Sequence, residues 1–211
     1  MLRTLFLISS FCHLLSCFGQ RPYHENVWSS LILNYKLSKW NINADAGYRW
    51  CDHFVNTKRT SLVRFSVDRS LGKIHRLGVG YAYFEHYNTI SSFENRLFLQ
   101  YIAGLNLSDS KLNIRIRNEL RTYNNRETGN RSRLQLSWLA DLNNRYGSQL
   151  SGEVFYTPGK KPLFEQRYTL GLISKFSDNI KILAFYTAQL QSNIDYLQHI
   201  IGLQLQIETR S

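Results

Sequence analysis

Residues Lys111 to Tyr123 read KLNIRIRNELRTY, and the order of polar and apolar side chains in this stretch indicates the fold. From the first lysine onward, every second residue is polar or charged, and the positions between them carry mainly leucine and isoleucine. Successive side chains of a β-strand point to opposite faces, so a strand here has one charged and one largely apolar face. A helix is the alternative, because Leu112, Ile116 and Leu120 are one helical turn apart. The neighbouring segments favour the strand.

The same alternation recurs along the rest of the chain. It is cleanest from Trp40 to Trp50, where apolar or aromatic residues alternate with polar residues and a glycine. About eleven consecutive segments follow this pattern at roughly ten residues each, whereas soluble strands average about 5–6 residues. Short turns such as Ser177-Asp178-Asn179 alternate with longer polar connections. The sequence therefore predicts an all-β protein, a single transmembrane antiparallel β-barrel of about 10–12 strands.

The position of the first segment, Asn26 to Leu37, is open at this point. If the short turns all lie at one end of the barrel, this segment runs in the same direction as the last strand. The strands from Trp40 onward would by themselves make an even set of about ten, which is usual for bacterial barrels. The first segment is then either an extra strand or lies elsewhere.

Residues 1–19 are typical of a secretory signal peptide. Arg3 supplies a positive start, a short apolar run follows, and the run ends with small residues at the positions that signal peptidase reads. We expect the mature chain to begin at Gln20 and the barrel to comprise residues 20–211. Lipidation at Cys17 is the alternative, because the residues before it loosely resemble a lipobox.

Charged side chains gather on the polar face of several segments, in a chain with 26 Lys and Arg against 15 Asp and Glu. In a membrane barrel that face points into the interior, the lumen. Charged side chains in a confined interior need partners of opposite charge, and the arginine guanidinium can bind both oxygens of a carboxylate. We therefore expect a lumen charge network formed by Glu94, Arg96, Arg115, Arg117, Glu119, Arg121, Arg133, Glu165 and Arg167.

Specific pairs can be proposed within this network. We expect three arginines of the opening stretch to pair across neighbouring strands with three glutamates and to close the lumen to bulk flow. The arginines are Arg115, Arg117 and Arg121, and the glutamates are Glu94, Glu119 and Glu165. Such an interior predicts a structural barrel or a narrow pore that prefers anions.

Two other functions are alternatives. A barrel enzyme acting on lipid or lipopolysaccharide would need serine, histidine and an acid near a rim. His86, His199, Ser92 and Ser192 lie near loops, but no spacing links them, so we assign no catalytic residue. A soluble secreted lipocalin-like binding barrel would show the same alternation with its apolar side facing inward.

Metals, cofactors and nucleic acid are not expected. Cys51-Asp52-His53 offers three adjacent donors without a distant fourth, which is weak evidence for a metal site. The positive charge is spread through alternating strands instead of one patch, which argues against nucleic acid. The expected partners are outer-membrane lipid and lipopolysaccharide, together with small anionic solutes.

Several short motifs resemble those of a known family. They are Trp28, Lys39-Trp40, Glu94-x-Arg96, Arg115-x-Arg117-x-Glu119-x-Arg121, Arg131-x-Arg133 and Glu165-Gln166-Arg167. Together they resemble DUF2490, a family of predicted outer-membrane β-barrels common in Bacteroidetes-type bacteria. The resemblance covers essentially the whole mature chain. It implies a barrel in the bacterial outer membrane and supplies no known activity.

Overall fold

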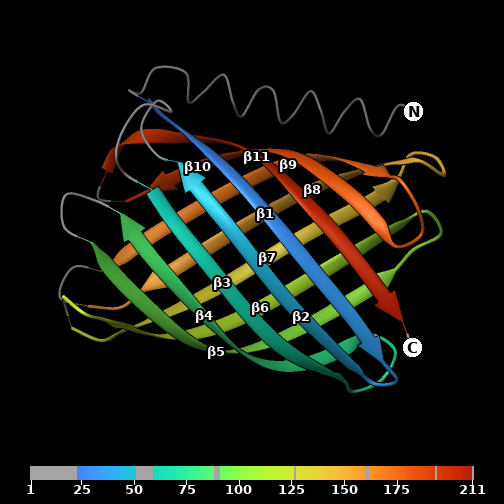
Figure 1. The fold of residues 1–211 in the computed structure, drawn as a ribbon, viewed down its shortest axis with the longest axis horizontal. Helices are drawn as coiled ribbons and strands as arrows, with labels where there is room; N and C mark the ends of the chain where they lie inside the picture. Colours follow the sequence, from blue (N-terminus) through green and yellow to red (C-terminus); the bar gives the residue numbers. More distant parts are fainter. Residues whose placement is uncertain are drawn as a thin grey trace.

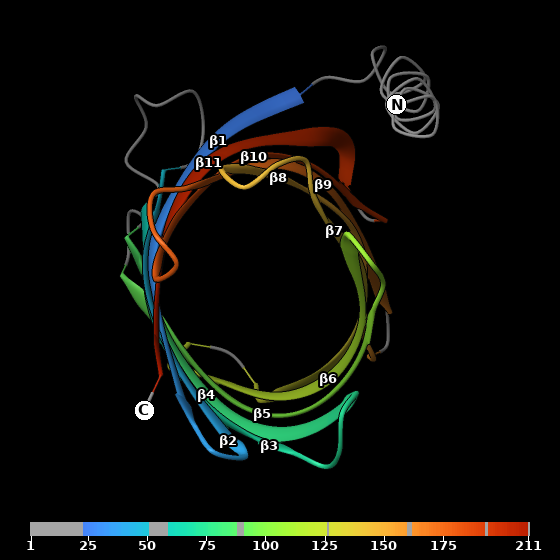
Figure 2. The same ribbon diagram turned by 90° about the vertical axis from the view of Figure 1, so that its right-hand side faces the viewer.

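The computed structural model describes residues 23–50, 59–87, 91–125, 127–159, 162–192 and 194–210. These residues form a closed barrel of eleven strands (Figures 1 and 2). The strands are β1 (Tyr23–Leu37), β2 (Trp40–Trp50), β3 (Arg59–Ser70), β4 (His75–Tyr87), β5 (Ser92–Asn106), β6 (Ser110–Tyr123), β7 (Gly129–Asp141), β8 (Tyr146–Thr157), β9 (Leu163–Lys175), β10 (Ile180–Gln191) and β11 (Ile194–Arg210). The predicted all-β barrel is confirmed, and its strand number lies within the predicted range.

Some predictions concern residues outside the described ranges. These are the signal peptide at residues 1–19, the cleavage before Gln20, and the Cys51-Asp52-His53 cluster. Within the described ranges, no helix has both the length and the apolar character needed to span a membrane.

The barrel closes through a parallel pair of strands. Each strand is antiparallel to its neighbour in sequence, and β1 lies between β2 and β11. β1 and β11 run in the same direction and pair in parallel, with Trp28 opposite Gly202. An odd number of strands that alternate in direction leaves the first and last strands parallel, so they can meet only in this way. The ten-strand alternative is therefore wrong, since segment 26–37 is part of the wall, and the barrel is not wholly antiparallel.

At one end of the barrel, at the right in Figure 1, every connection has two to four residues, and we call this the turn end. These connections comprise residues 38–39, 71–74, 107–109, 142–145 and 176–179. The connection between β1 and β2 has only two residues, and Ser38 there adopts a positive φ of 50°. A positive φ is common in two-residue hairpin turns, because the twist of such turns matches that of the strands. The opposite end is called the loop end.

The apolar face of the strands points outward. Val63, Val79 and Leu99 are 58, 55 and 60% exposed, and the sequence-predicted outer residue Ile116 is 45% exposed. The polar face points into the barrel, where Glu94 is only 1% exposed. This arrangement is the reverse of a lipocalin-like barrel, whose apolar side faces inward, so that alternative does not fit.

Glycines on β4 make room for large side chains in the lumen. A Cβ added at Gly78 would overlap the carboxylate of Asp68, and one added at Gly80 would overlap the ring of Phe98. Phe98 packs with Leu62 and neighbouring residues in a small apolar cluster inside the barrel. The interior is therefore not purely polar, and its aromatic rings position the charged side chains described next.

Candidate functional site

The lumen contains a cavity of about 480 Å³ to which all eleven strands contribute side chains. Eight-stranded barrels are just filled by their side chains, whereas barrels of about 16–18 strands leave an open channel. An eleven-stranded barrel lies between these limits, which accounts for a cavity of moderate size. Its charged lining consists of Arg49, Arg64, Arg76, Arg96, Arg115, Arg117, Arg131, Arg133 and Arg167, with Asp45, Asp68, Glu119 and Glu153. Nine arginines face four carboxylates, a formal excess of five positive charges.

A chain of ion pairs crosses β6, β7 and β8. Arg131 Nη2 lies 2.6 Å from Glu119 Oε2, and Arg133 Nη1 lies 2.7 Å from Glu119 Oε1. Arg133 also donates from Nη2 to Glu153 Oε1 at 2.8 Å, and Arg115 Nη2 reaches the same oxygen at 3.1 Å. Arg133 thus bridges two carboxylates, and the chain is buried, as charge pairs with good geometry can be.

A second cluster forms nearer the loop end around Glu94. Arg96 Nε and Nη2 donate to its two carboxylate oxygens at 2.8 Å each, and Arg121 contacts it as well. His86 Nε2 lies 3.6 Å from Glu94 Oε2. This carboxylate is therefore surrounded by basic side chains from β4, β5 and β6.

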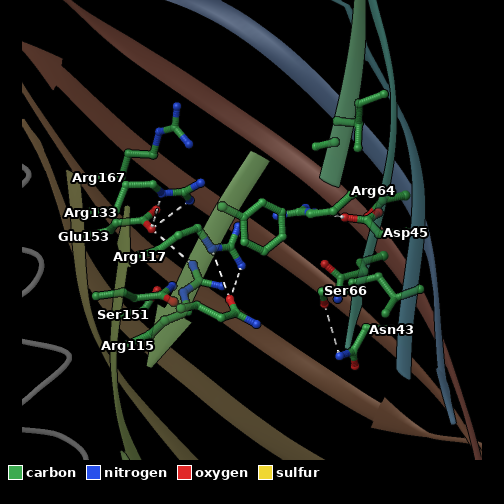
Figure 3. Close-up of a pocket in the computed structure, with 18 of the residues that line it drawn as sticks. Asn43, Asp45, Arg64, Ser66, Arg115, Arg117, Arg133, Ser151, Glu153 and Arg167 are labelled. Carbon is green, nitrogen blue, oxygen red and sulfur yellow. Dashed lines mark hydrogen bonds and ion pairs between the residues drawn. The ribbon is translucent and has the colours of Figure 1, made fainter. Parts of the chain in front are cut away.

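The opposite wall carries a smaller polar network. Arg64 on β3 pairs with Asp45 on β2, and Figure 3 shows them across the cavity from Arg115 and Arg133. Gln100 Nε2 donates to Asp68 Oδ1 at 2.6 Å, and its Oε1 accepts two bonds from Arg117. Gln100 therefore links Asp68 on β3 to Arg117 on β6 through hydrogen bonds.

The specific pairs predicted from the sequence are partly wrong. Arg121 does contact Glu94, but Arg115 pairs with Glu153, which the sequence-based network omitted. Arg117 bonds the amide of Gln100 and has no carboxylate partner among the described residues. The physical reason is the register, which sets which residues lie opposite one another and cannot be read from alternation alone.

Glu165 also differs from expectation. Its ion-pair partner is Arg167, two residues further along the same strand β9, at 2.5 Å. Arg167 Nε additionally donates to Gln189 Oε1 on β10 at 2.8 Å. Glu165 therefore belongs to a local pair on the wall and does not neutralise the arginines of β6.

Aromatic rings pack against the guanidinium groups of several lumen arginines. The Cζ atoms of Arg96 and Arg117 lie 3.8 and 4.1 Å from the ring centroids of Phe84 and Phe98. Arg133 lies 4.7 Å from the Phe155 ring centroid. Stacking holds a guanidinium plane in place and leaves its edge free to bind other groups. These rings were not predicted to lie in the lumen, although Phe84, Phe98 and Phe155 stand on the polar parity of their strands, which was the available signal.

The residues considered for catalysis do not form one centre. His86 Nδ1 lies 3.0 Å from Thr60 Oγ1, and its register partner is Ser92. His199 contacts Tyr186, and the Ser192 hydroxyl accepts a bond from the Phe164 amide. The nearby Glu94 is already bound by two arginines. Among the described residues, no group of three or more Cys, His, Asp or Glu is suited to hold a metal ion.

The fold and this site define a closed β-barrel with an arginine-lined, positively charged interior. The model of the DUF2490 family, described as a protein of unknown function, matches residues 25–198, so the chain belongs to this family. The resemblance seen in the sequence motifs is thereby confirmed. Comparison with curated proteins finds no match.

Solved structures of an outer membrane protein of Vibrio cholerae, OmpT, are similar in shape. The outer-membrane-expressed form gives a TM-score of 0.47 at 12% identity, covering 75% of this chain and 53% of that chain. A loop L8 deletion mutant gives 0.49 at 11% identity, covering 77% and 57%. This chain therefore spans little more than half the length of those proteins.

Proposed function

We propose that this protein is an outer-membrane β-barrel whose interior forms a narrow, anion-preferring pore. The observation that carries the proposal is the predominance of arginine in the cavity lining, nine arginines against four carboxylates. A confined space lined by one sign of charge raises the local concentration of the opposite ion. Rings of arginine or lysine are the means by which pores select anions.

The exterior supports placement in a membrane. Strands of 11 to 17 residues are at least as long as the roughly 9–11 residues that a tilted strand needs to cross the hydrocarbon core. Outward leucines such as Leu97, Leu134 and Leu203 are 59, 52 and 59% exposed. An apolar surface that follows the whole wall far exceeds the few hundred Å² that soluble monomers tolerate. Lipid contact satisfies this surface.

The ion pairs limit how wide the pore is. Glu119, Glu153 and Glu94 each hold two or more arginines against the wall, so much of the lumen is occupied by paired side chains. Only the arginines in excess of carboxylates remain to attract anions. We therefore propose a small conductance with clear selectivity, and not a wide general porin.

Conductance in planar bilayers tests the proposal. Mature protein should give small single-channel steps, and its reversal potential in a KCl gradient should show preference for chloride. Arg117→Gln should weaken that preference, because it removes a cavity charge without orphaning a carboxylate. Arg69→Gln is the matched control, since Arg69 is exposed on the outer parity of β3, 5.5 Å from the Trp40 ring centroid. A barrel that inserts but conducts no current contradicts the pore and leaves a structural barrel. A barrel that conducts but prefers potassium contradicts the anion preference.

A further inference from the structure

We infer that the lumen contains a binding site for an oxyanion, a phosphate or carboxylate group, held by Arg117 and Arg115 on β6. The inference rests on the proposed pore for the route by which the ion enters. It goes further by naming the class of anion that the interior recognises.

Arg117 has donors to spare in a buried position. Arg117 is only 4% exposed, and its side chain lines the cavity. Nε and Nη2 both donate to Gln100 Oε1, at 3.1 and 2.5 Å. A guanidinium carries five N–H groups, so the remaining donors have no acceptor among the described residues. Because Arg117 lines the cavity, these donors are available to an acceptor that enters it.

Arg115 presents a second unfilled donor on the same strand face. Its Nη2 bonds Glu153, but its buried Nε has no hydrogen-bond partner among the described residues. Residues two apart on a strand point to the same side, so Arg115 and Arg117 both face the cavity (Figure 3). Two arginines with spare donors on one wall form a site that can bind a single anion from both.

The charge around Arg117 also lacks compensation. Arg115, Arg133 and Arg64 line the same cavity, and Arg133 is the register partner of Arg117 on β7. The two nearby carboxylates, Glu119 and Glu153, are already bound by other arginines. A mobile anion is therefore the missing countercharge of this wall.

The shape of the donors favours an oxyanion over chloride. The guanidinium fork matches two oxygen atoms of one carboxylate or phosphate, whereas a spherical ion meets only part of it. The Phe98 ring packs against the Arg117 guanidinium and restricts its motion, so less conformational freedom is lost on binding. Inorganic phosphate is the simplest probe that carries this chemistry.

Thermal unfolding of the full mature chain in detergent measures binding without requiring a pore. Phosphate should raise the unfolding midpoint of the wild type in a saturable manner, relative to chloride at equal ionic strength. Arg117→Lys keeps the charge and loses the fork, so its apparent phosphate affinity should fall about tenfold or more. The unfolding midpoint of each variant in phosphate is compared with the midpoint of the same variant in chloride. A loss of stability caused by the substitution itself therefore does not change the measured phosphate response. Arg69→Lys should behave as wild type.

A second measurement separates this site from the pore. Phosphate added to both sides of a bilayer should reduce the chloride current of the wild type and leave that of Arg117→Lys less affected. Saturable stabilisation without any current supports the site and rejects the pore. Chloride current without phosphate stabilisation supports the pore and overturns the site. Equal stabilisation by phosphate and chloride, or an unchanged phosphate response in Arg117→Lys, also overturns it.

Discussion

Gly80 of β4 and Phe98 of β5 are register partners, and the Phe98 ring occupies the space where a side chain at position 80 would lie. The Phe98 ring in turn packs against the guanidinium of Arg117. A missing side chain on one strand therefore positions an arginine two strands away. Close approach of this kind is a common reason for glycine inside a strand.

Gly80→Ala should destabilise the barrel by about 1–3 kcal/mol, the usual cost of overpacking. The new methyl group would lie 2.6 Å from the Phe65 carbonyl oxygen as well as overlapping the Phe98 ring. Urea unfolding in detergent measures the loss. Gly152→Ala is the control, because its methyl group would meet only Tyr168 at an ordinary 3.9 Å. Equal stability of the two variants would contradict the packing of Phe98.

Ile116→Arg should impair folding into bilayers far more than Asn113→Arg. Ile116 lies on the exposed outer face, whereas Asn113 stands on the opposite parity of β6 and faces inward. An arginine at a lipid-facing midplane site costs about 2–4 kcal/mol. Heat-dependent gel mobility reports the folded fraction. The assignment of faces to lipid fails if both variants fold with the same yield.

Glu119→Ala should cost about 3–5 kcal/mol of stability, because its carboxylate is buried and balances Arg131 and Arg133. It should also increase anion preference, since Arg131 loses its closest carboxylate and Arg133 keeps only Glu153. Asp141→Ala removes a carboxylate that is 65% exposed in its pair with Lys175, so it should cost at most about 1 kcal/mol. Urea midpoints for the two variants, with bilayer selectivity for Glu119→Ala, check both statements. Indistinguishable midpoints would show that the Glu119 cluster is solvated.

Ser38→Gly should stabilise the barrel slightly, whereas Ser38→Val should destabilise it. Ser38 adopts φ of 50°, which glycine accepts without strain and a β-branched residue does not. We expect a gain of a few tenths of a kcal/mol up to about 1 kcal/mol for glycine. Refolding yield and urea midpoint measure it. A valine variant as stable as the wild type would argue against this turn geometry.

Alternation alone was enough to predict the barrel and to divide its residues between two faces. The period of two is a local property, so Arg115 and Ile116 could be assigned to opposite sides without knowledge of any neighbour. Glu153 stands on the polar parity of β8, so the same rule places it inside, yet the rule cannot indicate which arginine the carboxylate meets. That depends on how far each strand is shifted against the next.

The register shows why the pairs were missed. Arg115 lies opposite Gln135 on β7, and Gln135 lies opposite Glu153 on β8. The ion pair therefore spans an intervening strand, while the prediction considered neighbouring strands only. Arg117 faces a like charge, Arg133, in its own register pair, which leaves Gln100 as its hydrogen-bonding partner. Long side chains in a curved, narrow interior reach beyond adjacent residues, and only the closed barrel shows this.

The parallel pair of β1 and β11 limits how the gene can be rearranged. In an even-stranded barrel, the two ends of the wall lie at the same rim, and a short linker can join them to make a circular permutant. Here β1 begins at the loop end and β11 finishes at the turn end, because the two strands run side by side in the same direction. A linker from Arg210 to Tyr23 would have to cross the full height of the wall, which takes a dozen residues or more. New termini are therefore best created by splitting the chain into two co-expressed fragments, with the native ends left apart.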